Sequence, residues 1–380
     1  MSLRVSSDFD GGNAEVIDAS SPSDIRLRIR KDAGDKFLQW FHFRVSGAGD
    51  APIVVRIENA GDVTYRRGFV GYRAVASTDR EDWYRIDTTF EDGVLELRHP
   101  PADAVWIAYF APYSMQRHHD QVARWASDPR VSLEVLGATL DGQDLDCLHV
   151  GEGPLSIWCI ARQHPGETMA EHWMDGFLAR LTDPDEPVAR RLLQRATLHV
   201  VPNMNPDGSR RGHLRTNASG ANLNREWLEP SMERSPEVYL VRERMRQTGV
   251  DLCLDVHGDE EMPHVFIAGA DGIPSLTDHQ RSLLARFKQE LVRLSPDFQT
   301  EHGYPKAAPG EANLRMCTNW VAETFGCLAM TLEMPFRDAN DLPLPRTGWS
   351  PARSAHLGRA CLAAIAAVAG DLRDEVDSAR

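Results

Sequence analysis

Short alternating or aromatic-rich runs make up the first 115 residues, which show almost no helical periodicity. Glycine, aspartate and proline residues separate these runs. Turn residues at this spacing are typical of all-β proteins, so the pattern predicts an antiparallel β-sandwich. We expect its strands at residues 26–30, 38–45, 53–58, 83–87, 93–98 and 104–110.

After Tyr113 the pattern changes to continuous apolar runs that alternate with segments of helical periodicity. Met169, Trp173 and Phe177 recur at every fourth position of an expected helix over 167–181. Apolar strands that alternate with helices predict an α/β sheet covered on both faces. We expect strands at residues 132–139, 145–150, 155–161, 197–201, 252–256, 265–268 and 328–333, and further helices at 116–127, 236–247, 275–294 and 352–373.

The change of pattern falls near residues 112–125, and 380 residues are enough for two or three domains, each with its own core. We therefore expect a β-sandwich of residues 1–118 and a second domain of residues 119–380. The chain holds 42 Lys and Arg against 56 Asp and Glu, a net charge of −14. Because phosphate binding depends on clustered basic residues, this balance argues against a nucleic-acid partner.

Six cysteines lie far apart in mostly apolar runs, and none forms a CxxC pair. This pattern favours buried free thiols in a reducing compartment over disulfides or a metal set. The N-terminal segment has no apolar signal core, and no window approaches 18 uncharged apolar residues. We expect a cytoplasmic protein without a membrane partner, and the oligomeric state stays open.

His164 and Glu167 lie three positions apart at the turn between the expected strand 155–161 and the helix that follows. An imidazole and a carboxylate at this spacing can converge on one ion, and the Pro165-Gly166 step lets the chain turn there. Alone, the pair is a weak signal, because a surface histidine and a glutamate in the first turn of a helix make the same pattern. A third ligand is needed.

His257 ends the buried run of residues 252–256 and precedes Gly258. Its imidazole is therefore expected at the carboxyl end of a strand, where ligands collect in open α/β sheets. Two histidines and one glutamate, with a fourth position for water, form the ligand set of a hydrolytic zinc site. On its own, His257 could equally be a histidine at the edge of the core.

Further motifs join these three residues: Asn-Pro-Asp-Gly at 205–208, Arg215, Asn224-Arg225 and Glu333 in the expected late strand. In this order, the set resembles the zinc carboxypeptidases of the M14 type. Residues 9–14, 38–45 and 109–114 also look like the β-sandwich that precedes the catalytic domain in the cytosolic carboxypeptidase subfamily. The resemblance covers nearly the whole chain. It implies an N-terminal antiparallel β-sandwich followed by an α/β/α carboxypeptidase domain with a mixed central sheet.

Carried over to this chain, the resemblance implies that His164, Glu167 and His257 hold one Zn²⁺ per chain. Glu333 becomes the general base for the attacking water and later the proton donor to the leaving amine. Arg215 stabilises the developing oxyanion. A solvated Arg215 and a structural Glu333 at the end of its strand are the plainer alternatives.

The resemblance also implies that Asn224 and Arg225 bind the free C-terminal carboxylate of a peptide or protein substrate, a task suited to a guanidinium fork. The family builds the pocket for the terminal side chain partly from the segment before the late glutamate. Here that segment contains Tyr304, Lys306 and Arg315. Cations in this pocket would favour a terminal glutamate or aspartate, unless both point to solvent.

Two positions depart from the family pattern. Asn222 stands where the family usually has an aspartate. If this side chain is the partner of a zinc-bound histidine, a neutral amide replaces a carboxylate there, and zinc affinity could fall, although the amide oxygen can still accept the imidazole N–H. Met330 stands where cytosolic relatives have a tyrosine, and Tyr304 is the nearest tyrosine upstream of Glu333. Tyr304 is thus a candidate for the catalytic tyrosine, with a surface loop aromatic as the alternative.

Three functions remain open at this point. The first is a zinc carboxypeptidase acting on peptide C-termini, with acidic residues preferred. The second is a deacylase of N-acyl amino acids, of the succinylglutamate desuccinylase and aspartoacylase type. The third is a non-catalytic binding protein that keeps the pocket. The order of the domains and the Asn-Pro-Asp-Gly run favour the first.

Overall fold

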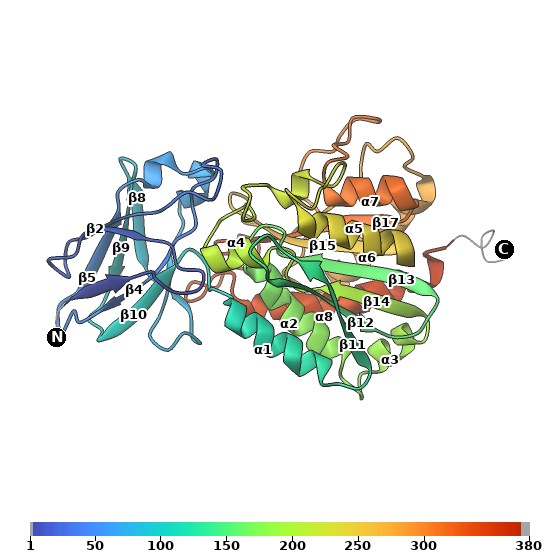
Figure 1. The fold of residues 1–380 in the computed structure, drawn as a ribbon, viewed down its shortest axis with the longest axis horizontal. Coiled ribbons are helices and arrows are strands. Elements are labelled where there is room, and N and C mark those ends of the chain that lie inside the picture. Colours follow the sequence, from blue (N-terminus) through green and yellow to red (C-terminus); the bar gives the residue numbers. More distant parts are fainter. Residues whose placement is uncertain (1–2, 374–380) are drawn as a thin grey trace.

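Two β-sheets that pack on each other form the N-terminal part of the protein, at the left of Figure 1. The computed structural model describes residues 3–373. The first sheet has the order β1 (Arg4–Ser6), β4 (His42–Ser46), β10 (Ala104–Ala108), β6 (Val75–Ser77) and β7 (Tyr84–Arg85). The second has the order β2 (Glu15–Asp18), β3 (Ile25–Arg28), β5 (Ile53–Ile57), β9 (Val94–His99) and β8 (Asp87–Glu91). Two short 3₁₀ turns, η1 (Ala60–Asp62) and η2 (Arg66–Phe69), follow β5.

The alternation of side chains explains this sandwich. In β3, Ile25 and Leu27 are buried, whereas Arg26 and Arg28 are exposed, because successive side chains point to opposite faces of a strand. The predicted sandwich is confirmed, with one difference. β3 and β5 run parallel, because the chain crosses to β4 in the other sheet before it returns beside β3.

A seven-stranded mixed sheet forms the centre of the second part, as predicted. Its order is β11 (Val131–Ala138), β12 (Asp144–Val150), β14 (Ala196–Val201), β13 (Leu155–Ala161), β15 (Leu252–Asp259), β17 (Leu328–Pro335) and β16 (Phe266–Gly269). β14, β13, β15 and β17 run parallel, while β11, β12 and β16 are antiparallel to their neighbours. The carboxyl ends of these four adjacent parallel strands therefore meet at one edge, where α/β proteins bind ligands.

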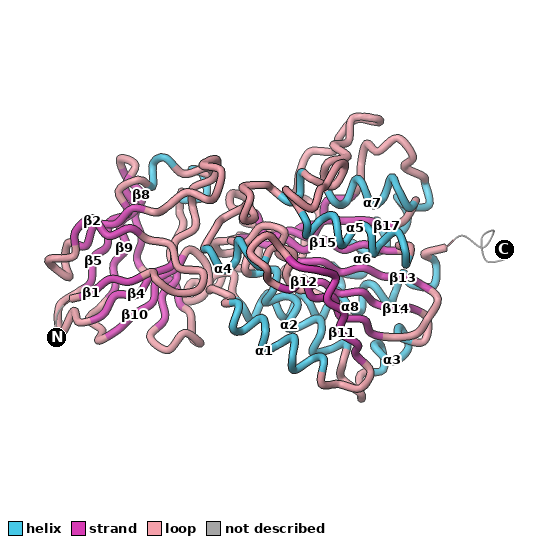
Figure 2. The backbone as a smooth tube through the Cα atoms, in the orientation of Figure 1, coloured by secondary structure: helices cyan, strands magenta, loops and turns pink. Residues whose placement is uncertain are grey.

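Helices cover both faces of this sheet, as Figure 2 shows. One face packs against α2 (Met169–Leu181), α3 (Pro187–Leu193), α6 (Asp278–Leu294) and α8 (Pro351–Val368), and the other against α5 (Pro236–Thr248) and α7 (Cys317–Phe325). The remaining helical segments are α1 (Met115–Ala126), α4 (Pro206–Arg211), η3 (Leu223–Arg225) and η4 (Ala369–Asp371). α2 and α8 approach closely because Gly176 carries no side chain. A Cβ there would lie 1.9 Å from the Ala355 carbonyl oxygen.

Two helices begin later in the chain than predicted. α6 begins at Asp278 rather than at residue 275, because Thr277 and Gln280 form a reciprocal capping box. α2 begins at Met169, so Glu167 lies in the turn before the helix. The short helices α3, α4 and α7 were not predicted. Among residues 3–373, no helix has the length and apolar character needed to cross a membrane.

Arg85 ties the two parts of the molecule together. Its buried guanidinium donates hydrogen bonds to the carbonyl oxygens of Phe336 at 2.7 Å, Thr347 at 3.1 Å and Trp349 at 3.2 Å. All three carbonyls belong to the segment between β17 and α8. The sandwich is thus fixed beside the carboxyl ends of the parallel strands.

Candidate active site

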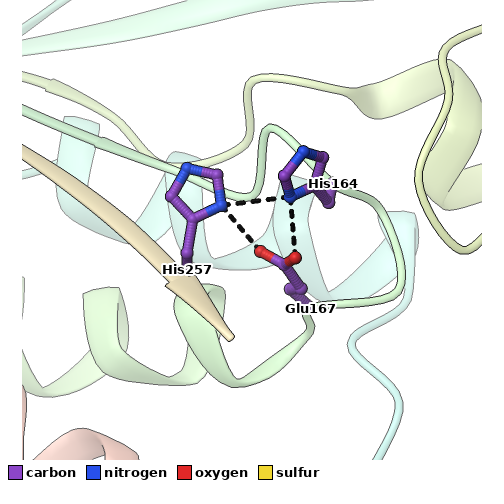
Figure 3. A group of neighbouring side chains, drawn as sticks. All are labelled: His164, Glu167 and His257. Atoms are coloured by element: carbon purple, nitrogen blue, oxygen red, sulfur yellow. Dashed lines mark hydrogen bonds and ion pairs between the residues drawn. The ribbon is translucent and has the colours of Figure 1, made fainter. Parts of the chain in front are cut away.

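Three side chains from two separate parts of the chain converge at this edge of the sheet (Figure 3). His164 and Glu167 lie in the turn between β13 and α2, and His257 lies on β15. Glu167 contacts His164 Nδ1 at 2.7 Å and His257 Nδ1 at 2.8 Å, and the two Nδ1 atoms are 3.1 Å apart. All three side chains are buried.

The outer nitrogens of both imidazoles have their own partners. His164 Nε2 lies 3.0 Å from Asn222 Oδ1, and His257 Nε2 lies 2.9 Å from Asp255 Oδ2. Both partners are hydrogen-bond acceptors, so Nε2 carries the proton and each Nδ1 presents a lone pair. Two lone pairs and a carboxylate then face one another at less than 3.2 Å. This donor set fits a divalent metal ion such as Zn²⁺, because a shared cation balances groups that otherwise repel one another.

Electrostatics at this cluster also favour a cation. Burial lowers the pKa of His164 to about 4, which keeps its imidazole neutral as a metal ligand must be. Burial would lower the pKa of His257 too, but Asp255 and Glu167 outweigh it and raise that pKa. The negative surroundings that attract a proton to His257 equally attract a metal ion.

Asp255 was not singled out from the sequence. It precedes His257 by two residues on the same strand, so both side chains point to the same face. An acid two residues before a ligand on a strand is therefore the signal that could have identified it. The amide of Gln163 lies beside this pair, with Nε2 2.7 Å from Asp255 Oδ2.

Glu333 lies next to the cluster on β17. The parallel pairing of β15 and β17 places it directly opposite His257. Its Oε1 accepts a hydrogen bond from the Tyr304 hydroxyl at 3.1 Å, and its Oε2 has no hydrogen-bond partner among residues 3–373. Burial, together with Glu167 and other nearby carboxylates, raises the pKa of Glu333 well above its usual range. A buried carboxylate that keeps one oxygen without a hydrogen-bond partner at a cleft is typical of a general acid or base.

Arg215 reaches the cluster from the loop after α4. Its Nη1 lies 3.5 Å from Glu167 and 3.4 Å from Glu260, both at Oε1. The guanidinium also lies over the Tyr65 ring, 5.2 Å from its centre. Tyr65 and Glu260 were not identified from the sequence. The signal for Glu260 was its place three residues after His257, whereas nothing local marks Tyr65.

Asn224 and Arg225 line the same cleft from η3. Asn224 Oδ1 accepts a hydrogen bond from the backbone amide of Cys317 at 2.8 Å, and its Nδ2 lies 3.5 Å from His257 Nε2. Arg225 Nη1 donates to the Asn224 carbonyl at 2.6 Å. Burial and the charge of Arg215 lower the pKa of Arg225. A guanidinium with neutral partners near a second cation is well suited to an anionic ligand.

The three predicted specificity residues occupy different positions. Tyr304 lines the cleft, and its hydroxyl bridges Glu333 and Asp259, the latter at 2.6 Å. Lys306 lines the outer cleft and pairs with Asp271 at 3.3 Å. Arg315 is not among the residues that line the cleft. It donates to the carbonyl of Arg225 at 2.9 Å and so supports η3 from behind.

Residues 203–208, which contain the Asn-Pro-Asp-Gly run, build the loop behind the site and do not line the cleft. Asn205 caps α4 by accepting a hydrogen bond from the Gly208 amide at 3.0 Å. The buried Asp207 accepts one from the Thr139 hydroxyl at 2.6 Å. The run therefore fixes the backbone that leads to Arg215.

One cleft of about 930 Å³ contains most of these groups. His164, Glu167 and Glu333 lie at one end, and Lys288, Lys306 and Asp271 line the other. Thr318 and Thr331, joined by a 2.7 Å hydrogen bond, also line the cleft. Burial lowers the pKa of Lys288, and Asp271 opposes that change. The volume suits several residues of an extended peptide or a small molecule.

Comparison with known proteins identifies relatives for both parts. The family model for zinc carboxypeptidases, peptidase M14, matches residues 120–356, and a model for the cytosolic carboxypeptidase N-terminal domain matches residues 5–110. An uncharacterized protein from Zymomonas mobilis is 53% identical over 96% of both chains. Cytosolic carboxypeptidase 6 from Caenorhabditis elegans is 24% identical and is matched over 86% of this chain and 77% of its own length.

Solved structures give the same result. A metallo-carboxypeptidase from Pseudomonas aeruginosa, in complex with (2-guanidinoethylmercapto)succinic acid, is 48% identical with a TM-score of 0.95, covering 97% of this chain and 100% of its own. A metallo-carboxypeptidase from Burkholderia cenocepacia is 44% identical with a TM-score of 0.94, covering 97% of this chain and 99% of its own. With its donor set, its cleft and both domain matches in agreement, the chain belongs to the M14 zinc carboxypeptidases and carries the N-terminal domain of the cytosolic carboxypeptidase group.

Proposed function

We propose that this metallocarboxypeptidase releases the last residue of peptides or protein tails, using one Zn²⁺ per chain, and that it prefers an acidic last residue. One observation carries the proposal: three ligand donors converge beside the unpartnered carboxylate oxygen of Glu333. The names of the relatives and the six buried free cysteines support a cytoplasmic location.

Zn²⁺, when bound by His164, Glu167 and His257, supplies a Lewis acid that polarises a carbonyl and lowers the pKa of water. Glu333 accepts the proton of the attacking water at Oε2 and delivers it to the leaving amine. Tyr304 restrains the other oxygen of Glu333 by the 3.1 Å hydrogen bond. Arg215 stabilises the negative charge that develops on the carbonyl oxygen.

Arg225 and Asn224 bind the free C-terminal carboxylate of the substrate. Within residues 3–373, the guanidinium of Arg225 has only a carbonyl oxygen as its hydrogen-bond acceptor, so its remaining N–H groups are available to a carboxylate. Asn224 lies between Arg225 and His257, which keeps the terminal carboxylate next to the metal end of the cleft. An exopeptidase needs this arrangement, because the bond it cleaves is the one nearest the chain end.

The acidic preference rests on two lysines at the far end of the cleft. Lys288 is half-buried there, and Lys306 lies at the rim. The Thr318 and Thr331 hydroxyls add polar contacts in a cleft whose lining also includes apolar side chains such as Phe266. Because Lys306 is 76% exposed, its contribution is screened by water, and Lys288 carries most of the preference.

A basic last residue is the second candidate. Asp271 lies beside both lysines, and the Pseudomonas relative was solved with a ligand that has a guanidinium besides its two carboxyl groups. A terminal arginine could then replace Lys306 as the partner of Asp271. The same peptide series tests both candidates.

The test uses protein loaded with one equivalent of Zn²⁺ and peptides that differ only in their last residue: Glu, Gln, Arg or Leu. A charge-assisted contact is worth about 1.5–3 kcal/mol, and partial exposure brings the expected Glu-over-Gln ratio in kcat/KM to about 10. If Arg is the best last residue, the basic candidate replaces the acidic one.

Amidated versions of the same peptides test the carboxylate requirement. Amidation removes the charge that Arg225 binds, so cleavage should be abolished, and Arg225→Ala should chiefly lower kcat/KM on the free acids. Equal turnover of acid and amide peptides would refute carboxypeptidase activity. Endopeptidase activity or another hydrolase activity of the same fold would then remain.

A further inference from the structure

The loop that carries Arg215 lies against the N-terminal β-sandwich rather than against its own domain alone. Asn13 Nδ2 donates to the Gly212 carbonyl at 3.1 Å, and Ala33 N donates to His213 Nε2 at 3.3 Å. Contact is so close at Gly220 that a Cβ there would lie 2.7 Å from the Ala33 carbonyl oxygen. The whole segment 212–220 is therefore shaped by the sandwich.

Asp32 makes the strongest of these contacts. Its Oδ1 accepts a hydrogen bond from the Leu214 amide at 2.7 Å, and its Oδ2 accepts from the amides of Arg215 at 2.7 Å and Thr216 at 3.0 Å. The Thr216 hydroxyl also lies 3.3 Å from Oδ2. One buried carboxylate thus binds three successive backbone N–H groups centred on Arg215. Charge-assisted bonds of this kind are stronger than neutral ones and fix the backbone direction.

The sandwich also contacts the Arg215 side chain. The guanidinium lies 5.2 Å from the centre of the Tyr65 ring and 6.0 Å from that of Phe37. Tyr65 is itself held by the buried Gln39 carboxamide, which accepts from the Tyr65 amide at 2.8 Å and donates to its carbonyl at 3.1 Å. The backbone that carries this ring is therefore fixed by the sandwich, and Tyr65 lines the cleft.

We propose that the N-terminal sandwich is a working part of the active site, in which Asp32 is a positioning residue that sets the place of Arg215 and Tyr65 orients its guanidinium. The inference rests on the proposed function, because it takes Arg215 as the group that stabilises the oxyanion. Long side chains lose rotamer freedom when they are ordered, so a site that needs Arg215 in one position benefits from holding both its backbone and its guanidinium.

The main test is a double-mutant cycle with Asp32→Asn and Arg215→Ala in the full-length, Zn²⁺-loaded protein. Asparagine keeps the shape of Asp32, but one carboxylate oxygen becomes an NH₂ group. This group cannot accept hydrogen bonds from the backbone amides that Asp32 binds. Loss of one oxyanion-stabilising group lowers kcat by about 10²–10³-fold, and misplacing it should lower kcat by about 10-fold or more. In the Arg215→Ala background, Asp32→Asn should change kcat by less than about 2-fold, because its effect passes through Arg215.

Asp10→Asn is the matched control. Asp10 is also a carboxylate of the sandwich that accepts a hydrogen bond from a backbone amide, that of Met115 at the start of α1 at 2.5 Å, but within residues 3–373 no hydrogen bond or ion pair joins its side chain to residues 212–220. It should leave kcat within about 2-fold of the wild type. If Asp10→Asn lowers kcat as much as Asp32→Asn, or if the cycle is additive, Asp32 has only a structural role and the inference is wrong.

Hydrogen exchange supplies a readout that does not depend on activity. Asp32→Asn should speed amide exchange in a peptide covering residues 212–217 and leave a peptide covering 257–262 unchanged. If the wild type cleaves no C-terminal residue, the proposed function fails. Unchanged exchange at 212–217 would separately show that Asp32 does not hold the backbone around Arg215.

Tyr65→Leu tests the side-chain contact and remains available if Asp32→Asn fails to fold. A cation–π contact predicts a loss of about 3- to 30-fold in kcat that again disappears in the Arg215→Ala background. A loss of the same size in both backgrounds would overturn the proposal.

Discussion

The two ends of the cleft are built in different ways. At the metal end, the ligands are buried and come from strands or from a turn between a strand and a helix, and each histidine has a fixed outer partner. At the other end, Lys306 is 76% exposed and comes from a loop. Charges interact strongly where water is excluded and weakly where it screens them. Under the proposed function, buried groups would therefore carry the chemistry, while selectivity would depend on small contributions from exposed charges.

Removal of a metal ligand should have the largest effect. His164→Ala and His257→Ala each take away one of three protein ligands, so bound zinc and activity should both fall to background. Metal analysis of dialysed protein measures the first and peptide hydrolysis the second. His302→Ala is the control, because His302 lines the outer cleft outside the ligand cluster and should leave the metal content unchanged. Stoichiometric zinc in either ligand variant would show that the ligand assignment is wrong.

Glu333→Gln should come next, with a loss of about 10³-fold or more in kcat and no loss of zinc. The amide keeps the shape of the carboxylate but cannot accept the proton. Steady-state kinetics and metal analysis on the same sample separate the two effects. Glu301→Gln changes an acid at the cleft rim and serves as the control. Nearly normal kcat in Glu333→Gln would exclude Glu333 as the base.

The two histidines can be compared through their outer partners. His164 faces the neutral Asn222, whereas His257 faces the charged Asp255. Asn222→Asp should raise zinc affinity by about 10- to 100-fold, and Asp255→Asn should lower it by a similar factor, since a carboxylate makes its imidazole a stronger ligand. Competition with a chromogenic chelator measures both. If neither affinity changes, the outer partners do not tune the metal.

Charge reversal at the open end should have the smallest effect. Lys306→Glu should lower the Glu-over-Gln ratio by about 2- to 5-fold, as expected for a screened surface charge. Arg315→Glu should change the ratio by less than about 2-fold, because Arg315 does not line the cleft. The ratios come from kcat/KM on matched peptides. A larger effect at Arg315 than at Lys306 would show that Arg315, and not Lys306, contacts the last residue of the substrate.

Local patterns in the sequence were enough for much of this protein. Alternating side chains predicted the sandwich strands, continuous apolar runs predicted the central sheet, and both architectures are confirmed. The spacing of His164 and Glu167, with His257 at a strand end, picked out the three residues that the fold brings together. These signals are local, because strand and helix periods and a turn between them involve only neighbouring residues.

Tertiary structure decided what depends on distant segments. Asp32 meets an amide 182 residues away, Glu333 pairs in register with His257, and Arg315 points to a backbone carbonyl instead of the cleft. No periodicity reports such contacts, because loop positions follow from packing between whole elements rather than from their own sequence. The three residues of the candidate metal site could therefore be predicted from the sequence, whereas the support of Arg215 by the sandwich and the arrangement of the cleft are products of the assembled fold.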